Sequence, residues 1–233
     1  VHSAVSAAAW SSRPHEPRPS AGLRPDPRRG RTDRAARDGD AGASQRRAGR
    51  LAGAELHFKC ENFQRGGAFK FRGACNAVWS LAGDEARAGV VTHSSGNHGT
   101  ALALAAATRG IPAHVVVPEG AVQAKLALIE RAGAVLHRCA PHQSAREASA
   151  AEVQQAAGAR LVHPYADDRV MAGQGTIALE LLAQVPALDA LITPVGGGGL
   201  ASGVAIAAHG LRPGLPLFGA EPAGADDAAR SLA

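Results

Sequence analysis

The sequence predicts an α/β protein built on a doubly wound, mostly parallel sheet. From residue 51 onward, short apolar strand patterns alternate with longer helical patterns, and the connections between them are short. Aromatic residues make up only 3% of the chain, so its core must be built from Val, Leu, Ile and Ala. Glycines stand where predicted helices end, as at Gly110, Gly133 and Gly158.

The elements follow from the periodicity of the apolar residues. Short apolar or alternating runs predict strands at 55–61, 90–92, 111–117, 134–136, 161–163, 190–195 and 215–220. Longer Ala- and Leu-rich segments predict helices at 68–81, 99–109, 121–132, 143–157, 173–184 and 200–210. Strand and helix thus alternate along the chain, which favours parallel pairing through helical crossovers.

Composition and motifs divide the chain into four segments. Residues 1–50 hold eleven Arg, no Lys and five acidic residues, with almost no large apolar ones. We expect this Arg/Pro/Ala-rich segment to be disordered, or not native to the protein, as a frame error in GC-rich DNA would produce. Residues 51–83 are expected to begin a large domain, residues 84–164 to form a small domain, and residues 165–233 to continue the large one.

Charge and cysteine content exclude several classes of protein. The net charge of +5 comes from the N-terminal segment, because residues 51–233 hold fourteen basic and fifteen acidic residues. A nucleic-acid surface on the folded part is therefore not expected. Three cysteines without a C-x-x-C pair argue against a disulfide framework and favour a reducing, cytoplasmic location. No apolar run is long enough to span a membrane.

Lys70 stands between Phe69 and Phe71 at the start of a predicted helix. Apolar neighbours and the positive end of a helix both destabilise its ammonium form. The neutral amine that results is the nucleophile that a Schiff base requires. From these features alone, an ordinary surface lysine is the alternative interpretation.

Two small-residue turns follow predicted strands and open predicted helices. The first is Ser94-Ser95-Gly96-Asn97-His98-Gly99, at the carboxyl end of a strand, where open α/β sheets bind ligands. The second is Gly196–Gly199, whose backbone can approach an anion closely and predicts phosphate binding. Its spacing to Ala201 and Glu221 also fits the loose dinucleotide fingerprint, so a nucleotide-binding dehydrogenase is a second interpretation.

Acidic residues cluster after the last predicted strand, at Glu221, Asp226 and Asp227. Carboxylates are the ligands that hard cations prefer, so a divalent-cation site is one interpretation. Solvated acids that complement the start of a helix are the other.

Three separated motifs now stand in one order: Phe69-Lys70-x-Arg72-Gly73, Ser94–Gly99 and Gly196–Gly199. Together they resemble the pyridoxal-phosphate enzymes of fold type II, the tryptophan synthase β type, and within them the serine racemase and threonine/serine dehydratase group. The resemblance covers about residues 51–232 and extends to Phe58-Lys59-Cys60-Glu61-x-Phe63-Gln64 and Glu221-Pro222-x-x-Ala225-Asp226-Asp227. It implies a fold type II architecture that is incomplete at both ends of this chain.

The resemblance implies a role for each matched residue. Lys70 would bind pyridoxal phosphate covalently and move the proton on one face of the substrate α-carbon, and Ser95 would act on the opposite face. The cofactor would be held by Phe69, Lys70, Asn97, Gly196, Gly197, Gly198 and Gly199. The substrate would be held by Ser94, Ser95, Asn97, His98 and Arg146. Mg²⁺, or Ca²⁺ or Mn²⁺ in its place, would be held by Glu221, the Ala225 carbonyl and Asp227.

The implied activity is racemisation of L-serine to D-serine, with β-elimination of water to pyruvate and ammonia as its companion. Ser95 favours racemisation, because many threonine dehydratases of this group have Ala there. An L-threonine/L-serine ammonia-lyase without racemase activity is the alternative, as is an inactive truncated relative that acts as a binding module. The resemblance also implies ATP as an activator and a homodimer when the protein is complete.

Overall fold

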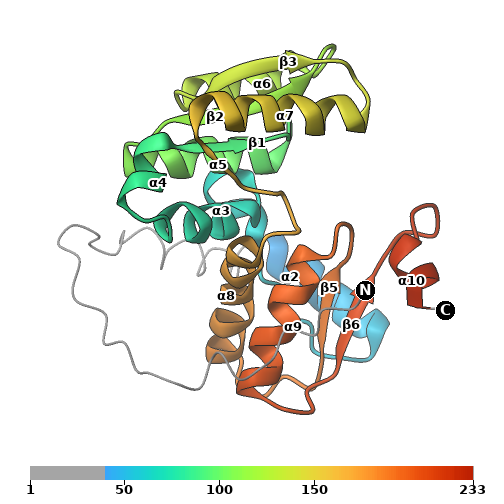
Figure 1. Ribbon diagram of the computed structural model, residues 1–233. Coiled ribbons are helices and arrows are strands. Elements are labelled where there is room, and N and C mark those ends of the chain that lie inside the picture. Colours follow the sequence, from blue (N-terminus) through green and yellow to red (C-terminus); the bar gives the residue numbers. More distant parts are fainter. Residues whose placement is uncertain (1–39, 233) are drawn as a thin grey trace. The chain divides into compact units, whose positions relative to one another are not determined.

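A computed structural model describes residues 40–232 (Figure 1). The chain divides into two units, residues 1–56 and 57–233, which we describe separately. In the first unit, α2 spans Asp40–Ala52. The disorder predicted for residues 1–50 is therefore wrong for residues 40–50, where Ala, Arg and Gln supply helix propensity. The rest of that prediction falls on residues 1–39, outside the described residues.

The second unit contains a four-stranded parallel sheet in the order β3-β2-β1-β4. Its strands are β1 (Val90–Thr92), β2 (Ala113–Pro118), β3 (Val135–Cys139) and β4 (Arg160–Leu161). The crossovers between them are α5 (Asn97–Arg109), α6 (Gln123–Arg131) and α7 (Gln143–Ala157). Parallel neighbours require such crossovers, so the alternation in the sequence is realised as predicted.

Helices cover both faces of this sheet (Figure 1). Val90 and Val115 belong to the core cluster that contains the apolar residues of α5 and α6. Val91 and Val116, the next residues along the same strands, pack in a separate cluster with Ala150 of α7. Because successive side chains of a strand point to opposite faces, α7 lies on one face and α5 on the other. The sheet is doubly wound.

A second, two-stranded parallel sheet pairs β5 (Leu191–Pro194) with β6 (Leu217–Ala220). Beside it, α8 (Asp168–Gln184) contacts both α3 (Lys70–Trp79) and α9 (Gly199–Leu211). Glycines make these contacts close: a Cβ on Gly173 would lie 2.6 Å from the Arg72 carbonyl oxygen, and one on Gly203 would lie 2.1 Å from that of Met171. The backbones of α8 and its neighbours can therefore meet only because these positions lack a side chain.

The strand predicted at residues 55–61 is wrong. Residues 55–60 pair with no strand of the described chain, and the 3₁₀ turns η2 (Glu61–Phe63) and η3 (Arg65–Gly67) follow them. Side chains hold this segment instead, since Lys59 Nζ lies 2.9 Å from a carboxylate oxygen of Glu180. An alternating pattern without a neighbouring strand cannot form a ladder.

Helix α8 begins at Asp168, earlier than the predicted residue 173. The reason is a side-chain cap: Asp167 Oδ1 accepts hydrogen bonds from the backbone N–H groups of Arg169, at 2.9 Å, and Val170, at 3.3 Å. The short helix α4 (Gly83–Ala88) was not predicted, whereas α10 (Asp227–Leu232) begins among the acidic residues that one interpretation placed at the start of a helix. The predicted division into residues 51–83, 84–164 and 165–233 stays a prediction.

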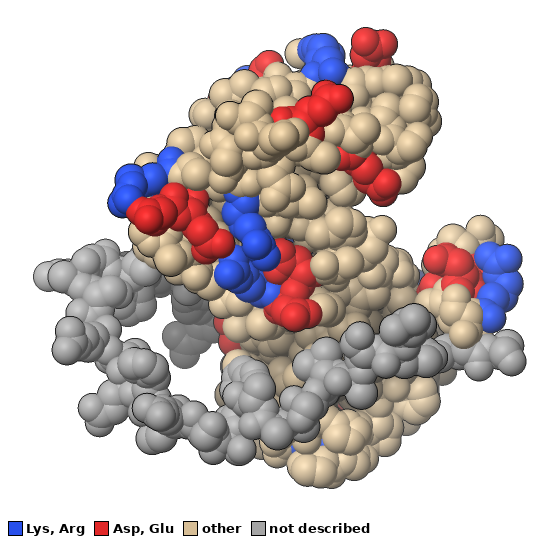
Figure 2. Space-filling model, in the orientation of Figure 1, with Lys and Arg blue, Asp and Glu red and all other residues tan. Residues whose placement is uncertain are grey.

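Surface charges of opposite sign lie next to one another on the face shown in Figure 2, and no patch of a single sign gathers there. Arg230 with Asp226, at 2.9 Å, is one such pair. The cysteines Cys60, Cys75 and Cys139 are free thiols. Within residues 40–232, no helix combines the length and the apolar character that crossing a membrane would require.

Candidate active site

The turn that follows β1 carries Ser94, Ser95 and Gly96, and Asn97 begins α5. Both serines are half-buried, whereas Asn97 is exposed. The turn is tight, because a Cβ on Gly99 would lie 1.9 Å from the Ser94 carbonyl oxygen. The first backbone N–H groups of a helix have no partner within it. Those of α5 are therefore free to bind a negatively charged group beside the two serines.

His98 fixes this turn to the interior of the protein. Its ring is buried, and Nε2 lies 3.1 Å from the Val162 carbonyl oxygen. Burial lowers the pKa of His98 to about 3, so the ring is neutral at pH 7 and Nε2–H donates to that carbonyl. Nδ1 is then an acceptor, and it has no hydrogen-bond partner among the described residues. A ring in this state cannot donate a side-chain hydrogen bond to a carboxylate.

Lys70, the first residue of α3, is half-buried. Its Nζ donates a hydrogen bond of 2.6 Å to the Pro164 carbonyl oxygen and lies 5.1 Å from the centroid of the Phe69 ring. Burial lowers the pKa of Lys70 below its usual value of 10.5. The lowered pKa agrees with the destabilised ammonium that the sequence predicts, and burial is its cause. The contact with the face of the Phe69 ring acts the other way, since it favours the charged amine, and the Phe71 ring packs under the Arg65 guanidinium.

The glycine run Gly196–Gly199 connects β5 to α9. Gly198 has φ +82°, a left-handed conformation that side chains disfavour. A Cβ on Gly197 would lie 2.5 Å from the ring of Tyr165, and one on Gly199 would lie 2.8 Å from the Tyr165 carbonyl oxygen. The loop therefore leaves a cradle of backbone against Tyr165, at the N-terminus of a helix of thirteen residues.

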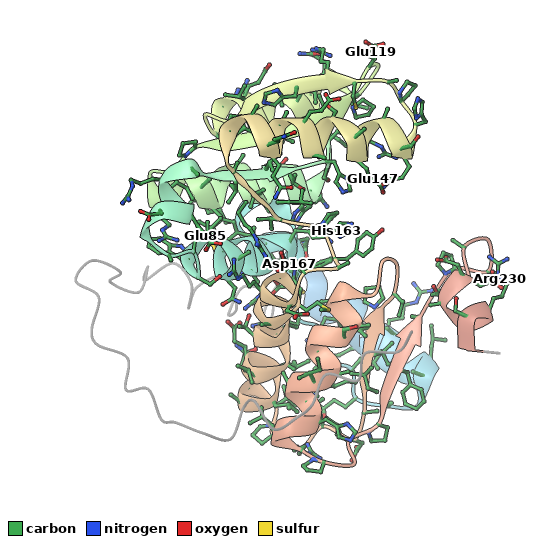
Figure 3. The ribbon with its side chains drawn as sticks, viewed as in Figure 1. Glu85, Glu119, Glu147, His163, Asp167 and Arg230 are labelled. Carbon is green, nitrogen blue, oxygen red and sulfur yellow. The ribbon has the colours of Figure 1, made fainter. Side chains whose placement is uncertain are left out.

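One segment, Val162–Tyr165, contacts all three motifs. Val162 accepts from His98, Pro164 accepts from Lys70, and Tyr165 packs against the glycine run. Figure 3 shows His163 and Asp167 on this connection, which leads from the four-stranded sheet to α8. The structure thus gathers Lys70, the turn of Ser95 and Gly196–Gly199 around one short stretch of chain.

Aromatic rings pack within this segment. The His163 ring lies edge-on to that of His93 at 5.2 Å and to that of Tyr165 at 4.6 Å, measured between centroids. Burial, and then the nearby charge of His93, lowers the pKa of His163. Nδ1 of His163 accepts a 3.0 Å hydrogen bond from the Ala166 backbone N–H, which fixes the turn before α8. Sequence reasoning missed this segment as part of the site; the run His163-Pro164-Tyr165 directly after a strand was the available signal.

The other predicted residues lie on separate elements. Arg146 is on the first turns of α7, a helix that packs on the four-stranded sheet, and its Nε is buried with no partner among the described residues. The two carboxylate oxygens of Glu221 accept hydrogen bonds from the backbone N–H groups of Ala228, at 3.2 Å, and Ala229, at 2.9 Å. Glu221 therefore caps α10, whose first residue is Asp227. Across residues 40–232, no group of three or more His, Cys, Asp or Glu side chains is placed to hold a metal ion.

Comparison with known proteins decides the family. The sequence profile of the pyridoxal-phosphate dependent enzymes matches residues 43–233. The chain belongs to this family. The match begins before residue 51, where the sequence resemblance was expected to start, and includes most of α2.

The relatives of this pyridoxal-phosphate family member include a serine racemase of Arabidopsis thaliana, 54% identical over 181 residues, which are 78% of this chain and 55% of the relative. A beta-hydroxyaspartate dehydratase of Paracoccus denitrificans is 53% identical over 78% of this chain and 58% of its own length. The crystal structure of serine racemase from Dictyostelium discoideum superimposes with a TM-score of 0.77 and 52% identity, over 79% of this chain and 60% of that one. The fold is thus fold type II, and the chain spans about half the length of the curated relatives it matches.

The residues present fit pyridoxal phosphate at both of its ends. The amine of Lys70 is half-buried with a lowered pKa, as covalent attachment of an aldehyde requires. Side chains at Gly197 and Gly199 would collide with Tyr165, and the glycine run opens a helix whose N-terminal N–H groups suit a phosphate. This family assignment favours a phosphate role for Gly196–Gly199 over the dinucleotide interpretation.

Proposed function

We propose that this protein racemises L-serine to D-serine with pyridoxal phosphate and also eliminates water from serine to give pyruvate and ammonia. The observation that carries the proposal is the convergence of Lys70, the serine turn and Gly196–Gly199 on Val162–Tyr165. The similarity to serine racemases supports the choice of reaction.

Lys70 is proposed to bind the cofactor covalently, with Phe69 packed beside it, Asn97 near its ring hydroxyl and Gly196–Gly199 around its phosphate. The distance of 5.1 Å from the Phe69 ring centroid to the Lys70 amine supports this role. When bound, pyridoxal phosphate supplies an electron sink for the negative charge left when the α-carbon loses its proton.

Two groups are proposed to move protons at the substrate α-carbon. The Lys70 amine, neutral more often than an exposed lysine because its pKa is lowered, takes the proton from one face. The Ser95 hydroxyl, from a separate part of the chain, returns a proton to the other face and inverts the configuration. If the β-hydroxyl leaves as water before that return, pyruvate and ammonia are the products.

The substrate carboxylate is proposed to bind at the start of α5, through Ser94, Ser95, Asn97 and His98, with Arg146 supplying a positive charge. Because the buried His98 ring already donates to Val162, its contribution is the backbone N–H in the first turn of α5. Arg146 supports this role because its partly buried guanidinium has an atom that lacks a partner among the described residues.

A divalent cation is proposed at Glu221, the Ala225 carbonyl and Asp227. The bond from the Ala228 N–H to Glu221 supports it, because it brings the Glu221 carboxylate to the first turn of α10, which begins at Asp227. A cation there would have to share Glu221 with the N-terminus of α10. Activation by ATP, a homodimer in the complete protein and a cytoplasmic location rest on the sequence arguments alone.

The decisive experiment is an absorbance titration with pyridoxal phosphate on the wild type, Lys70→Ala and Lys125→Ala. Lys125 is an exposed lysine of α6 and serves as the matched control. We expect a visible band of lysine-bound cofactor in the wild type and Lys125→Ala and none in Lys70→Ala. Equal bands in all three proteins would refute the role of Lys70.

The second candidate, an ammonia-lyase without racemase activity, is favoured by the similarity to the Paracoccus dehydratase. Chiral analysis of the product from L-serine and a pyruvate assay separate the two candidates. We expect D-serine and pyruvate from the wild type, and pyruvate without D-serine from Ser95→Ala. Pyruvate alone from the wild type would favour the ammonia-lyase. A cofactor band without either product would leave only the binding module.

A further inference from the structure

A pair of histidines lines a cavity between the four-stranded sheet and α7. His114 is on β2 and His137 is on β3, and His114 Nδ1 lies 3.0 Å from His137 Nε2. This cavity is a shallow one, widely open to solvent, with a volume of about 380 Å³, and it is lined by the two histidines and by Glu152, Val153, Ala156 and Ala157 of α7. None of the elements around it carries Lys70, Ser95 or the glycine run.

The face of the sheet explains why the two rings meet. Val116 of β2 and Cys139 of β3 pack in the cluster under α7. His114 lies two residues before Val116, and His137 lies two residues before Cys139. Side chains two residues apart point to the same face, so both rings face α7. Val116 is the register partner of His137, which places His114 one diagonal step away across the two strands. In Figure 1, α7 runs across these strands.

We propose that His114 and His137 form a binding site for a transition-metal dication of the zinc type, separate from the cofactor site. Neutral imidazole is a preferred ligand of Zn²⁺, with metal–nitrogen distances of about 2.0–2.1 Å. Tetrahedral geometry at that distance places two ligand nitrogens roughly 3.3 Å apart. The observed 3.0 Å is a few tenths of an ångström shorter, so the two nitrogens are already close enough to share a metal ion. The ion would lie off the line that joins them, so it replaces the shared hydrogen once both rings rotate to aim their lone pairs at it.

The remaining coordination positions fall inside the cavity. The described chain has no group of three side chains ready to hold a metal, so the site binds through two imidazoles and completes its shell with water or, after a rotamer change, with Glu152. A purely structural hydrogen bond between the strands is the competing explanation for the pair, and the experiment below separates the two.

The test is a titration with Zn²⁺ alone against a competing chromophoric chelator, on chain purified in EDTA and then freed of it. We expect one Zn²⁺ per chain in the wild type, and at least tenfold weaker binding in His114→Ala and in His137→Ala. His209→Ala, which removes an exposed histidine of α9, is the control and should bind like the wild type. His163→Ala should do the same, because that histidine belongs to the candidate active site.

Several results would overturn the proposal. One is that His114→Ala or His137→Ala binds Zn²⁺ with the affinity of the wild type. Another is that the control His209→Ala loses as much Zn²⁺ affinity as these variants do. A third is that only His163→Ala loses Zn²⁺ affinity. Folding of each variant is checked by circular dichroism in EDTA. A second readout is histidine NMR on the wild type, where substoichiometric Zn²⁺ should shift the ring signals of His114 and His137 first. Shifts confined to other histidines would refute the site without any variant.

Discussion

The substitution Glu180→Gln should lower the free energy of unfolding at pH 7. The difference from the wild type should become much smaller in acid. Arg72 donates two hydrogen bonds to each of Glu180 and Glu61, all of 2.8 Å, and Lys59 is a second cationic partner of Glu180, at 2.9 Å. These partners, led by the hydrogen bonds of Arg72, lower the pKa of Glu180 from 4.5 to about 2. The network ties the first turn of α3, which carries Lys70, to α8.

The size of the effect follows from linkage. A fall in pKa from 4.5 to about 2 corresponds to roughly 3 kcal/mol, at about 1.4 kcal/mol per pKa unit. The Glu180 side chain is 46% exposed, so solvent screening reduces this to about 1–2 kcal/mol. Because the folded-state pKa is lowered, the contribution is complete above pH 4.5 and is lost as the pH falls toward 2. Roughly half of it should be gone by pH 3.

Urea unfolding of the wild type and Glu180→Gln, followed by circular dichroism at pH 7, 4 and 3, measures this contribution. Glu130→Gln, at an exposed position of α6, is the matched control for loss of a carboxylate. We expect Glu180→Gln to be about 1–2 kcal/mol less stable than the control at pH 7, with the gap halved by pH 3. A gap that is absent at pH 7, or that does not shrink in acid, would refute the reasoning.

Three further predictions concern the site and its support. Covalent attachment of pyridoxal phosphate should rise with pH with an apparent pKa below 10.5, because burial lowers that of Lys70; a midpoint at or above 10.5 in absorbance titrations would contradict this. Gly197→Ala, whose methyl group would collide with Tyr165, should weaken cofactor binding at least tenfold relative to Gly196→Ala, which meets nothing within 4 Å; equal affinities would show that the cradle is not needed. Arg109→Met should lower the free energy of unfolding by about 1–3 kcal/mol, since Arg109 donates to two carbonyl groups at the C-terminal end of α3; calorimetry showing wild-type stability would refute this role.

Local chemistry explains which parts of the fold the sequence predicts well. Runs such as Val115–Val117 are apolar enough to be strands in almost any setting, and Gly110 and Gly158 end α5 and α7 with the left-handed conformation expected of them. The segment at 55–61 alternates just as clearly, yet it forms no strand, because a ladder needs a neighbour that local pattern cannot supply.

The same limit applies to the candidate site. Lys70 and Gly196–Gly199 could be found from their own neighbours, since burial between apolar residues and a glycine run after a strand are local features. The neutral state of the His98 ring could not be found in this way, because its pKa depends on burial and on a hydrogen bond to Val162, 64 positions away. Nor could the pairing of His114 with His137, which requires the register of β2 against β3.

The segment Val162–Tyr165 shows why some site residues leave only a weak signal in a sequence. Its bonds to His98 and Lys70 are accepted by backbone carbonyls, which every residue type possesses. What the sequence can encode is the shape of the turn: Pro164 has no N–H to offer, and His163 accepts the N–H of Ala166 to bring the chain into α8. The Pro164 carbonyl accepts the hydrogen bond of the Lys70 amine, and the neighbouring Tyr165 packs against Gly197. A phosphate bound at the glycine run and an aldehyde bound to the amine would therefore each contact one of two adjacent residues. Both ends of the proposed cofactor site therefore contact this one turn.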